Sequence, residues 1–139
     1  MAEEPSRSRD ALGVIEFGEP GAFRDRLVEL VLTGRKRATA ALLSEWEVAQ
    51  DPLEVGRRWA VVDSAGRRVA VVETTELRVG TFEDVEWEWI VDAGEGDESI
   101  EQWREGYLDY YERTTGSRPA LTTPVVYERF QLVPGEPTG

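Results

Sequence analysis

The sequence predicts a single α+β domain built around a small β-sheet or β-barrel. A chain of 139 residues suits one hydrophobic core. Helix-like and strand-like hydrophobic patterns follow each other in mixed order with short connections, which is typical of α+β proteins. We expect flexible tails at residues 1–12 and 134–139, which are polar or rich in proline and glycine, around one domain at 13–133.

A helix is predicted first, over residues 20–33, because apolar side chains recur there at three- and four-residue steps. Pro20 suits its first turn and Gly34 suits its end. The pattern then becomes strand-like up to Leu43 and loosens across residues 44–54. The remaining predicted elements are a hairpin with strands at 59–63 and 68–79, helices at 83–91 and 98–112, and a strand at 123–133.

The residue types that are missing restrict the chemistry. The chain has no Cys and no His, which excludes Ser-His-Asp and Cys-His nucleophile systems and zinc bound by His or Cys. Carboxylates, Tyr and Lys remain for acid-base work, with Ser or Thr as nucleophiles. We expect no metal and no cofactor. No apolar run has the length of a membrane span or of a secretory signal, so we expect a cytoplasmic protein.

The formal charge of −12 disfavours nonspecific binding to phosphate backbones, which depends on Lys and Arg. Ten acidic residues stand against Arg104 alone between residues 83 and 105. Binding of nucleic acid would therefore need a local basic patch. Its candidates are seven basic residues: Arg35, Lys36, Arg37, Arg57, Arg58, Arg67 and Arg68. The alternative interpretation is that they are solvated ends of strands that offset nearby acidic residues.

Two charged residues invite a chemical interpretation. Lys36 is the only lysine beside fifteen arginines, and lysine, unlike arginine, can lose its proton when it is desolvated. The alternative is a compositional bias toward arginine. Glu73 belongs to the odd-numbered face of its predicted strand, among apolar neighbours. It either points into a pocket or marks a register shift at a bulge.

The segment Gly34-Arg35-Lys36-Arg37-Ala38-Thr39 resembles the glycine-x-lysine-x-x-threonine signature of the ASCH domain family. Further matches follow in order, and the resemblance covers about residues 15–133. They are Phe17-Gly18, Val55-Gly56, Gly94-Glu95-Gly96-Asp97 and Trp103-Arg104. The resemblance implies a PUA-like small β-barrel flanked by helices.

The resemblance also implies nucleoside or RNA chemistry. Some members are amidohydrolases that remove the acyl group from N-acetylated cytidine, and others are RNA-binding proteins or ribonucleases. In the amidohydrolases the threonine is the proposed nucleophile, the lysine its base and a downstream glutamate a proton donor, which gives Thr39 and Lys36 the first two roles. In a straight strand these two side chains would face opposite sides, so a turn just after Gly34 is expected.

The chain departs from the family pattern at two positions. Related proteins commonly have Glu-Gly-Glu-Gly-Asp where this chain has Ala93 as the first residue, so Glu95 or Glu73 is the candidate for the glutamate. Tyr107 stands where a histidine is common. Trp46 or Trp59 could form one wall of a base pocket, since stacking on an aromatic ring contributes roughly 1 to 3 kcal/mol.

These observations predict a cleft lined by Lys36, Thr39 and a glutamate that binds a small nucleoside-like ligand and hydrolyses an amide on it. A second hypothesis is a noncatalytic module for single-stranded RNA that uses the basic patch, or a ribonuclease. A third is a protein-interaction domain whose acidic helices meet a basic partner. The oligomeric state stays open.

Overall fold

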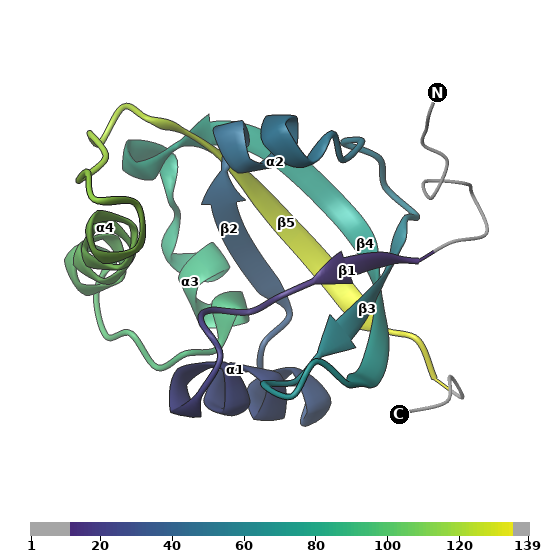
Figure 1. Ribbon diagram of the computed structural model, residues 1–139. Coiled ribbons are helices and arrows are strands. Elements are labelled where there is room, and N and C mark those ends of the chain that lie inside the picture. Colours follow the sequence, from purple (N-terminus) through teal and green to yellow (C-terminus); the bar gives the residue numbers. More distant parts are fainter. Residues whose placement is uncertain (1–11, 135–139) are drawn as a thin grey trace.

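The computed structural model describes residues 12–134 and shows a five-stranded mixed sheet with helices packed around it (Figure 1). The terminal tails predicted at 1–12 and 134–139 lie outside the described residues, apart from Leu12 and Pro134. The strands are β1 (Gly13–Ile15), β2 (Ala38–Leu42), β3 (Arg58–Val62), β4 (Arg68–Thr81) and β5 (Pro124–Leu132). The helices are α1 (Ala22–Leu32), α2 (Leu43–Ala49), the 3-10 turn η2 (Phe82–Asp84), α3 (Trp87–Ala93) and α4 (Ile100–Thr115).

The strand order is β1-β3-β4-β5-β2, with β1 parallel to β3 and the other neighbours antiparallel. The sequence predicted a closed PUA-like β-barrel, but the sheet is open. Within residues 12–134 the edge strands β1 and β2 do not pair with each other. Strand β1 is only three residues long, since the chain turns away at Gly18, whose φ of 72° ends extended structure. Both edge strands instead line the cavity described below.

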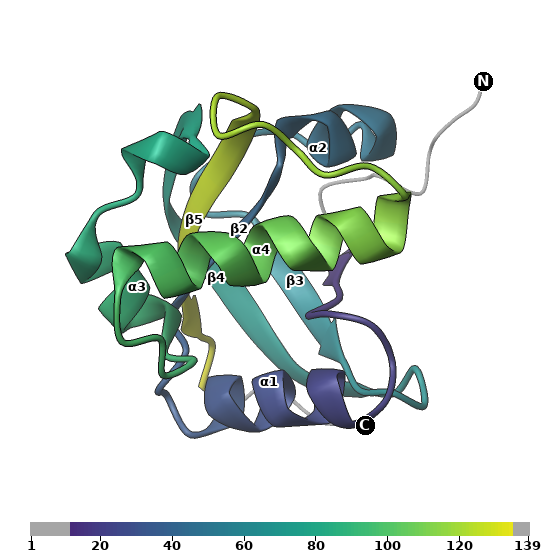
Figure 2. The ribbon, with the colours of Figure 1, turned by 90° about the vertical axis from the view of Figure 1, so that its left-hand side faces the viewer.

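The hydrophobic core lies on both faces of the sheet. One cluster joins α1 and α2 to the sheet, through Leu27, Val31 and Trp46. The other joins α3 and α4 to β2 and β5, through Trp89 and Trp103 among others. Helix α4 runs in front of the strands in Figure 2, and its buried residues Trp103, Leu108 and Tyr111 belong to the second cluster. A sheet that is covered on both faces explains why β3 after Arg58 and the middle of β5 are continuously buried.

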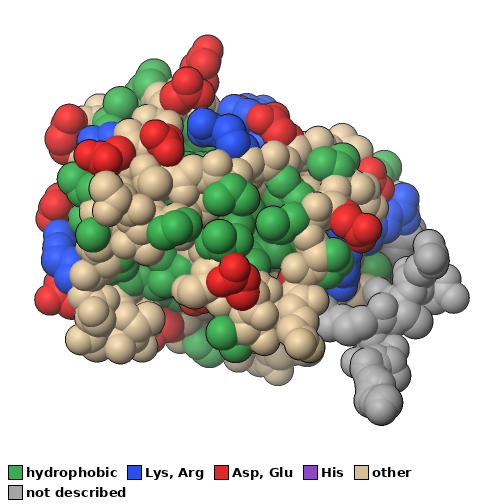
Figure 3. Space-filling view, turned by 90° about the horizontal axis from the view of Figure 1, so that it is seen from above, with side chains coloured by type: hydrophobic (Ala, Val, Ile, Leu, Met, Phe, Trp, Pro, Cys, Tyr) green, Lys and Arg blue, Asp and Glu red, His purple; other side chains and the backbone are tan. Residues whose placement is uncertain are grey.

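Most predicted elements are confirmed, with shifted ends. The helix expected at 83–91 divides into η2 and α3, because Val85 is extended between them. Two elements were not predicted, β1 and α2. Helix α2 has seven residues and buries only Trp46, while Val48 is 86% exposed, so it has no periodic apolar face. It lies on the upper side of the molecule, where hydrophobic side chains gather on the surface (Figure 3).

No helix within residues 12–134 is long and apolar enough to cross a membrane.

Candidate functional site

A cavity of about 640 Å³ opens between the two edge strands, α2 and α4. Strands β1, β2 and β5 contribute to its walls, together with the loop that follows α3. Six of the residues singled out in the sequence line this cavity: Lys36, Thr39, Trp46, Trp59, Glu95 and Tyr107. The fold thus brings together residues that are as far as 71 positions apart in the chain.

Lys36 is buried, with a relative exposure of 1%. Its Nζ atom donates to Glu95 Oε2 at 2.7 Å, to the Ala38 carbonyl oxygen at 2.9 Å and to the Ala93 carbonyl oxygen at 3.3 Å. An ammonium group has three donors, and here each of them has an acceptor. A neutral amine would instead turn its lone pair toward one of these oxygens. The arrangement therefore fits a protonated lysine.

The irregular start of β2, expected from the spacing of Lys36 and Thr39, is confirmed. The backbone N–H groups of Arg35 and Lys36 both donate to the Leu30 carbonyl, which wraps the chain around the end of α1 before β2 begins at Ala38. Lys36 and Thr39 thereby reach the same cavity.

Gly94 allows α3 to end directly against the backbone of Arg35 and Lys36, which we call the lysine segment. It has φ of 71°, and a Cβ atom there would lie 2.2 Å from the Arg35 carbonyl oxygen. The Arg37 N–H donates to the Asp92 carbonyl oxygen at 2.7 Å across the same contact. Only glycine suits both the left-handed backbone and this close approach. The carbonyl of Ala93, at the end of α3, consequently reaches Lys36.

Glu95 lies just beyond this contact, between two glycines with positive φ. Its backbone carbonyl accepts from Arg26 Nη2 at 2.8 Å, which ties the loop to α1. Asp97 also lines the cavity. Burial and the nearby charge of Glu95 raise the pKa of the Asp97 carboxyl, while Lys36 and Arg26 act against this rise. The motif Gly94–Asp97 therefore places two carboxylates beside the lysine.

Tyr107 comes from α4 and lines the cavity next to Thr39. Burial and the charge of Glu95 raise the pKa of its phenol, while hydrogen bonding with the Thr39 side chain and the Ala40 backbone acts in the opposite direction. Tyr107 is therefore a neutral phenol over the ordinary pH range, a group that can donate a hydrogen bond beside Thr39.

Trp46 and Trp59 form an aromatic wall. Their rings meet edge to face, with centroids 5.8 Å apart. The Trp59 indole Nε1–H donates to Thr74 Oγ1 at 2.9 Å, which fixes the ring. The Arg57 guanidinium lies over the same ring at 4.8 Å from its centroid.

Five other sequence candidates lie outside the cavity walls. Glu73 forms an ion pair with Arg58 at 3.0 Å, and Arg37 forms one with Asp92 at 2.7 Å. Arg57 lies over the Trp59 ring, and Arg35 is exposed and lines a separate depression of the surface. The bulge that the sequence offered as the alternative for Glu73 is present, because the register of β4 with β5 shifts between Thr74 and Glu76. Thr74, not Glu73, is the buried polar residue of this strand.

Glu128 is a cavity residue that the sequence reasoning missed. It lies on β5 directly opposite Thr39 of β2, and its relative exposure is 3%. Thr74 Oγ1 donates to Glu128 Oε2 at 2.6 Å. Burial raises the pKa of Glu128 to about 7, with a further contribution from the charge of Asp51, while the hydrogen bond from Thr74 lowers it. The only signal in the sequence is that Glu128 directly follows the apolar run Val125-Val126-Tyr127 in the closing strand.

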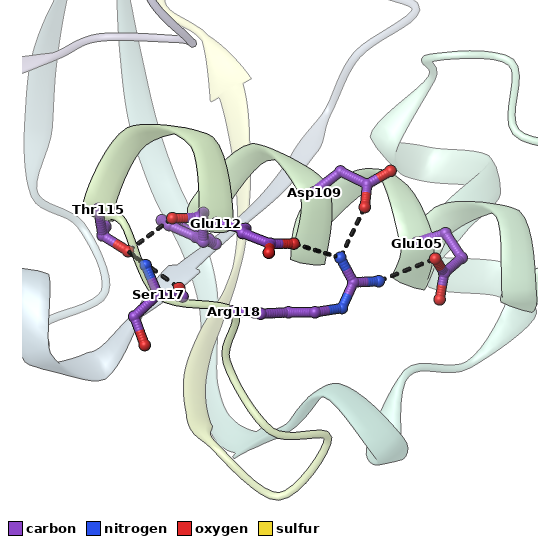
Figure 4. A network of polar contacts seen from close by, with 7 residues as sticks. Glu105, Asp109, Glu112, Thr115, Ser117 and Arg118 are labelled. Carbon is purple, nitrogen blue, oxygen red and sulfur yellow. Dashed lines mark hydrogen bonds and ion pairs between the residues drawn. The ribbon is translucent and has the colours of Figure 1, made fainter.

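Arg118, in the loop that follows α4, contacts the side of this helix, which also carries Tyr107 (Figure 4). The Arg118 guanidinium donates to three carboxylates on one side of the helix. They are Glu105 at 2.8 Å, Asp109 at 2.7 Å and Glu112 at 2.9 Å. This contact holds the loop after α4 against the helix.

The cavity is strongly acidic. Seven carboxylates line it against two cations, Lys36 and Arg113. The carboxylates are Glu16, Glu45, Asp51, Glu95, Asp97, Asp109 and Glu128. Such a field repels phosphate and favours a neutral or cationic ligand.

A comparison with protein-family models identifies one family, and solved structures share the fold. Residues 13–134 match the ASCH domain. Protein EF3133 from Enterococcus faecalis V583 has a similar structure, with a TM-score of 0.76 and 21% identity over 87% of this chain and 76% of that chain. The ASCH domain from Lactobacillus crispatus JV V101 has a TM-score of 0.74 and 23% identity over 87% of this chain and 79% of that chain. No curated protein matches this chain.

Proposed function

The chain belongs to the ASCH domain family, and from this premise we propose that its cavity binds a nucleoside-like ligand and hydrolyses an N-acyl amide on it. The observation that carries the proposal is the convergence of Lys36, Thr39 and Glu95 on one cavity that also has an aromatic wall. The ligand has a planar base that stacks on Trp46 or Trp59.

Thr39 is the nucleophile of the proposed reaction. Its hydroxyl lies beside the Tyr107 phenol, in a cavity that also holds Lys36 and several carboxyl groups. A threonine needs a nearby proton acceptor in order to attack a carbonyl carbon. Lys36 and Glu95 hold each other in one orientation through their ion pair. The Tyr107 phenol is available to donate a hydrogen bond to the acyl oxygen as negative charge develops on it.

The charge of the cavity supports a small ligand over RNA. Seven carboxylates oppose a phosphate backbone, whereas a nucleoside carries no phosphate. Two arginines of the basic patch are already paired with carboxylates, Arg37 with Asp92 and Arg58 with Glu73. The noncatalytic RNA-binding alternative therefore gains no support from these contacts.

The test is incubation of the protein with a panel of N-acylated cytidine-like nucleosides. We expect the wild type to release the free amine and Thr39→Ala to lose more than about 10³-fold in rate. Glu73→Gln is the matched control, since Glu73 lies outside the cavity, and it should retain the wild-type rate. Equal rates in the wild type and Thr39→Ala would remove Thr39 from the mechanism.

A binding measurement separates this proposal from RNA recognition. We expect nucleoside binding, followed by quenching of tryptophan fluorescence, to change little between low and high salt. Binding of single-stranded RNA that weakens steeply with salt, together with no response to nucleosides, would favour the RNA-binding alternative instead.

A further inference from the structure

A threonine nucleophile needs a group that takes its proton, and Lys36 is poorly arranged for this role. All three donors of its Nζ atom are directed at oxygen acceptors, at 2.7, 2.9 and 3.3 Å. A protonated amine in this arrangement has no lone pair with which to accept a proton. The proton acceptor must therefore be another group beside Thr39.

Glu128 is the carboxyl that the sheet places opposite Thr39. The two residues are partners in the antiparallel register of β2 and β5, and both line the cavity. Side chains of directly opposed residues point to the same face of a sheet, with Cβ atoms about 4.5 to 5.5 Å apart. A carboxyl and a hydroxyl on such a pair are within reach of each other.

Glu128 is also held in a defined orientation. The indole N–H of Trp59 donates to the Thr74 hydroxyl oxygen, and that hydroxyl donates to Glu128 Oε2. Because Oε2 accepts from Thr74, Oε1 is the oxygen left to exchange a proton with Thr39. A buried hydrogen-bonded carboxyl next to a nucleophile is the arrangement of a general base.

We propose, on the premise that Thr39 is the nucleophile of the function above, that the Glu128 carboxylate takes the proton of the Thr39 hydroxyl and passes it to the departing amine. Glu128 thus takes the base role that the family resemblance gives to Lys36. Lys36 instead keeps Glu95 in place as its charged partner.

The proposed reaction balances without a cofactor. Thr39 Oγ1 bonds to the acyl carbon while Glu128 receives the hydroxyl proton, the C–N bond breaks, and the nitrogen takes that proton and leaves as the amine. Water then attacks the threonine ester, Glu128 accepts a proton from the water, the ester C–O bond breaks, and Thr39 regains its proton as the carboxylic acid is released. The sum is one amide and one water giving one acid and one amine.

The pH dependence follows from the surroundings of Glu128. Burial raises its pKa to about 7, Asp51 adds to the rise, and Thr74 opposes it. Other charged groups along the cavity are Glu16 before α1, Glu45 of α2, and Asp109 and Arg113 of α4, besides the cluster of Lys36, Glu95 and Asp97. The carboxylate, which is the base, predominates above pH 7, so the reactivity of Thr39 should rise with pH through that value.

The experiment uses phenylmethanesulfonyl fluoride, which forms a stable sulfonate on an activated hydroxyl with loss of fluoride and needs no knowledge of the substrate. The adduct on Thr39 is quantified by mass spectrometry of peptides from pH 5.5 to 9. We expect labelling of the wild type to rise through pH 7, a loss of about 10² to 10⁴-fold in Glu128→Gln, and no change in the control Glu73→Gln. Undiminished labelling of Glu128→Gln, or no labelling of the wild type, would overturn the proposal.

A second variant guards against a purely structural effect of Glu128→Gln. Thr74→Val keeps Glu128 and removes the hydrogen bond that lowers its pKa. The midpoint of the labelling profile should therefore move to higher pH, and an unmoved midpoint would contradict the role of Glu128. Failure of the amidohydrolase function alone has a different signature, in which Thr39 is labelled in the expected manner but no acylated nucleoside is hydrolysed.

Discussion

Lys36 Nζ and Glu95 Oε2 lie 2.7 Å apart, although 59 positions separate the two residues in the chain. The lysine side chain is buried, and the glutamate side chain is more accessible. This ion pair joins the segment before β2 to the loop after α3, the two segments that carry the family signatures.

Loss of the carboxylate from this pair should be costly. Glu95→Ala leaves a buried ammonium without its charged partner, for which we expect a loss of about 3 to 5 kcal/mol in the free energy of unfolding. The double variant Lys36→Met, Glu95→Ala should recover part of the loss, because it removes the charge that was left alone. Urea denaturation of both variants measures this difference, and Glu73→Ala serves as an exposed ion-pair control that should cost less than about 1 kcal/mol. A double variant no more stable than Glu95→Ala would contradict this account.

The ionisation of Glu128 should couple stability to pH. Its pKa is raised on folding to about 7 from an ordinary value near 4.5, so the folded protein binds more protons than the unfolded chain between these values. The contribution of Glu128 to stability is therefore fully present below about pH 4.5, falls as pH rises to about 7, and is constant above it. Over this window the loss is on the order of 3 kcal/mol.

Glu128→Gln removes this dependence. Chemical denaturation at pH 5 and pH 8 should show that the variant gains stability relative to the wild type at the higher pH. The same difference between the two proteins at both values would show that Glu128 does not titrate in this range.

The glycines on either side of Glu95 should differ in their tolerance of alanine. Gly94 and Gly96 both have positive φ, so alanine at either position is strained by about 1 to 2 kcal/mol. Only Gly94 also approaches the Arg35 carbonyl, whereas a Cβ on Gly96 meets open space. Gly94→Ala should therefore lose clearly more stability than Gly96→Ala in urea denaturation. Equal losses would mean that the contact of α3 with the lysine segment is not tight.

Arg118 should stabilise the carboxyl end of α4 modestly and in a salt-dependent manner. Its ion pairs with Glu105, Asp109 and Glu112 are exposed to solvent, where such pairs contribute little and are screened by salt. Arg118→Gln should speed amide hydrogen exchange in the last turns of α4 at low salt. The difference from the wild type should shrink in high salt, and a difference that persists there would indicate a packing effect instead.

The placement of Lys36 and Thr39 at one cavity could be predicted because both belong to one six-residue segment that resembles the ASCH signature. The signature between Gly34 and Thr39 contains its own turn, and the loop that holds Glu95 follows a predicted helix. For the glutamate of the site, the sequence left Glu95 and Glu73 as alternatives. Glu95 lies beside Lys36, and Glu73 faces Arg58.

Glu128 could not be assigned from the sequence because strand β5 has no alternating pattern there. Val125, Val126, Tyr127 and Glu128 are all buried, since both faces of the strand are covered. The side chain that faces Thr39 is decided by the register of β2 with β5, a long-range property. The open sheet could not be predicted from the sequence either. Strand β1 has only three residues, too few to give a strand pattern, and it pairs with β3. Strands β1 and β2 are therefore the two edges of the sheet.

The burial of Lys36 has a practical consequence for following the opening of the fold. It is the one lysine side chain of the protein, and in the folded state its amine is enclosed and engaged by three oxygens. A reagent that acylates amines can modify that side chain only in molecules that have transiently opened. The rate at which the peptide containing Lys36 gains mass would therefore measure how often the folded protein opens enough to expose this side chain.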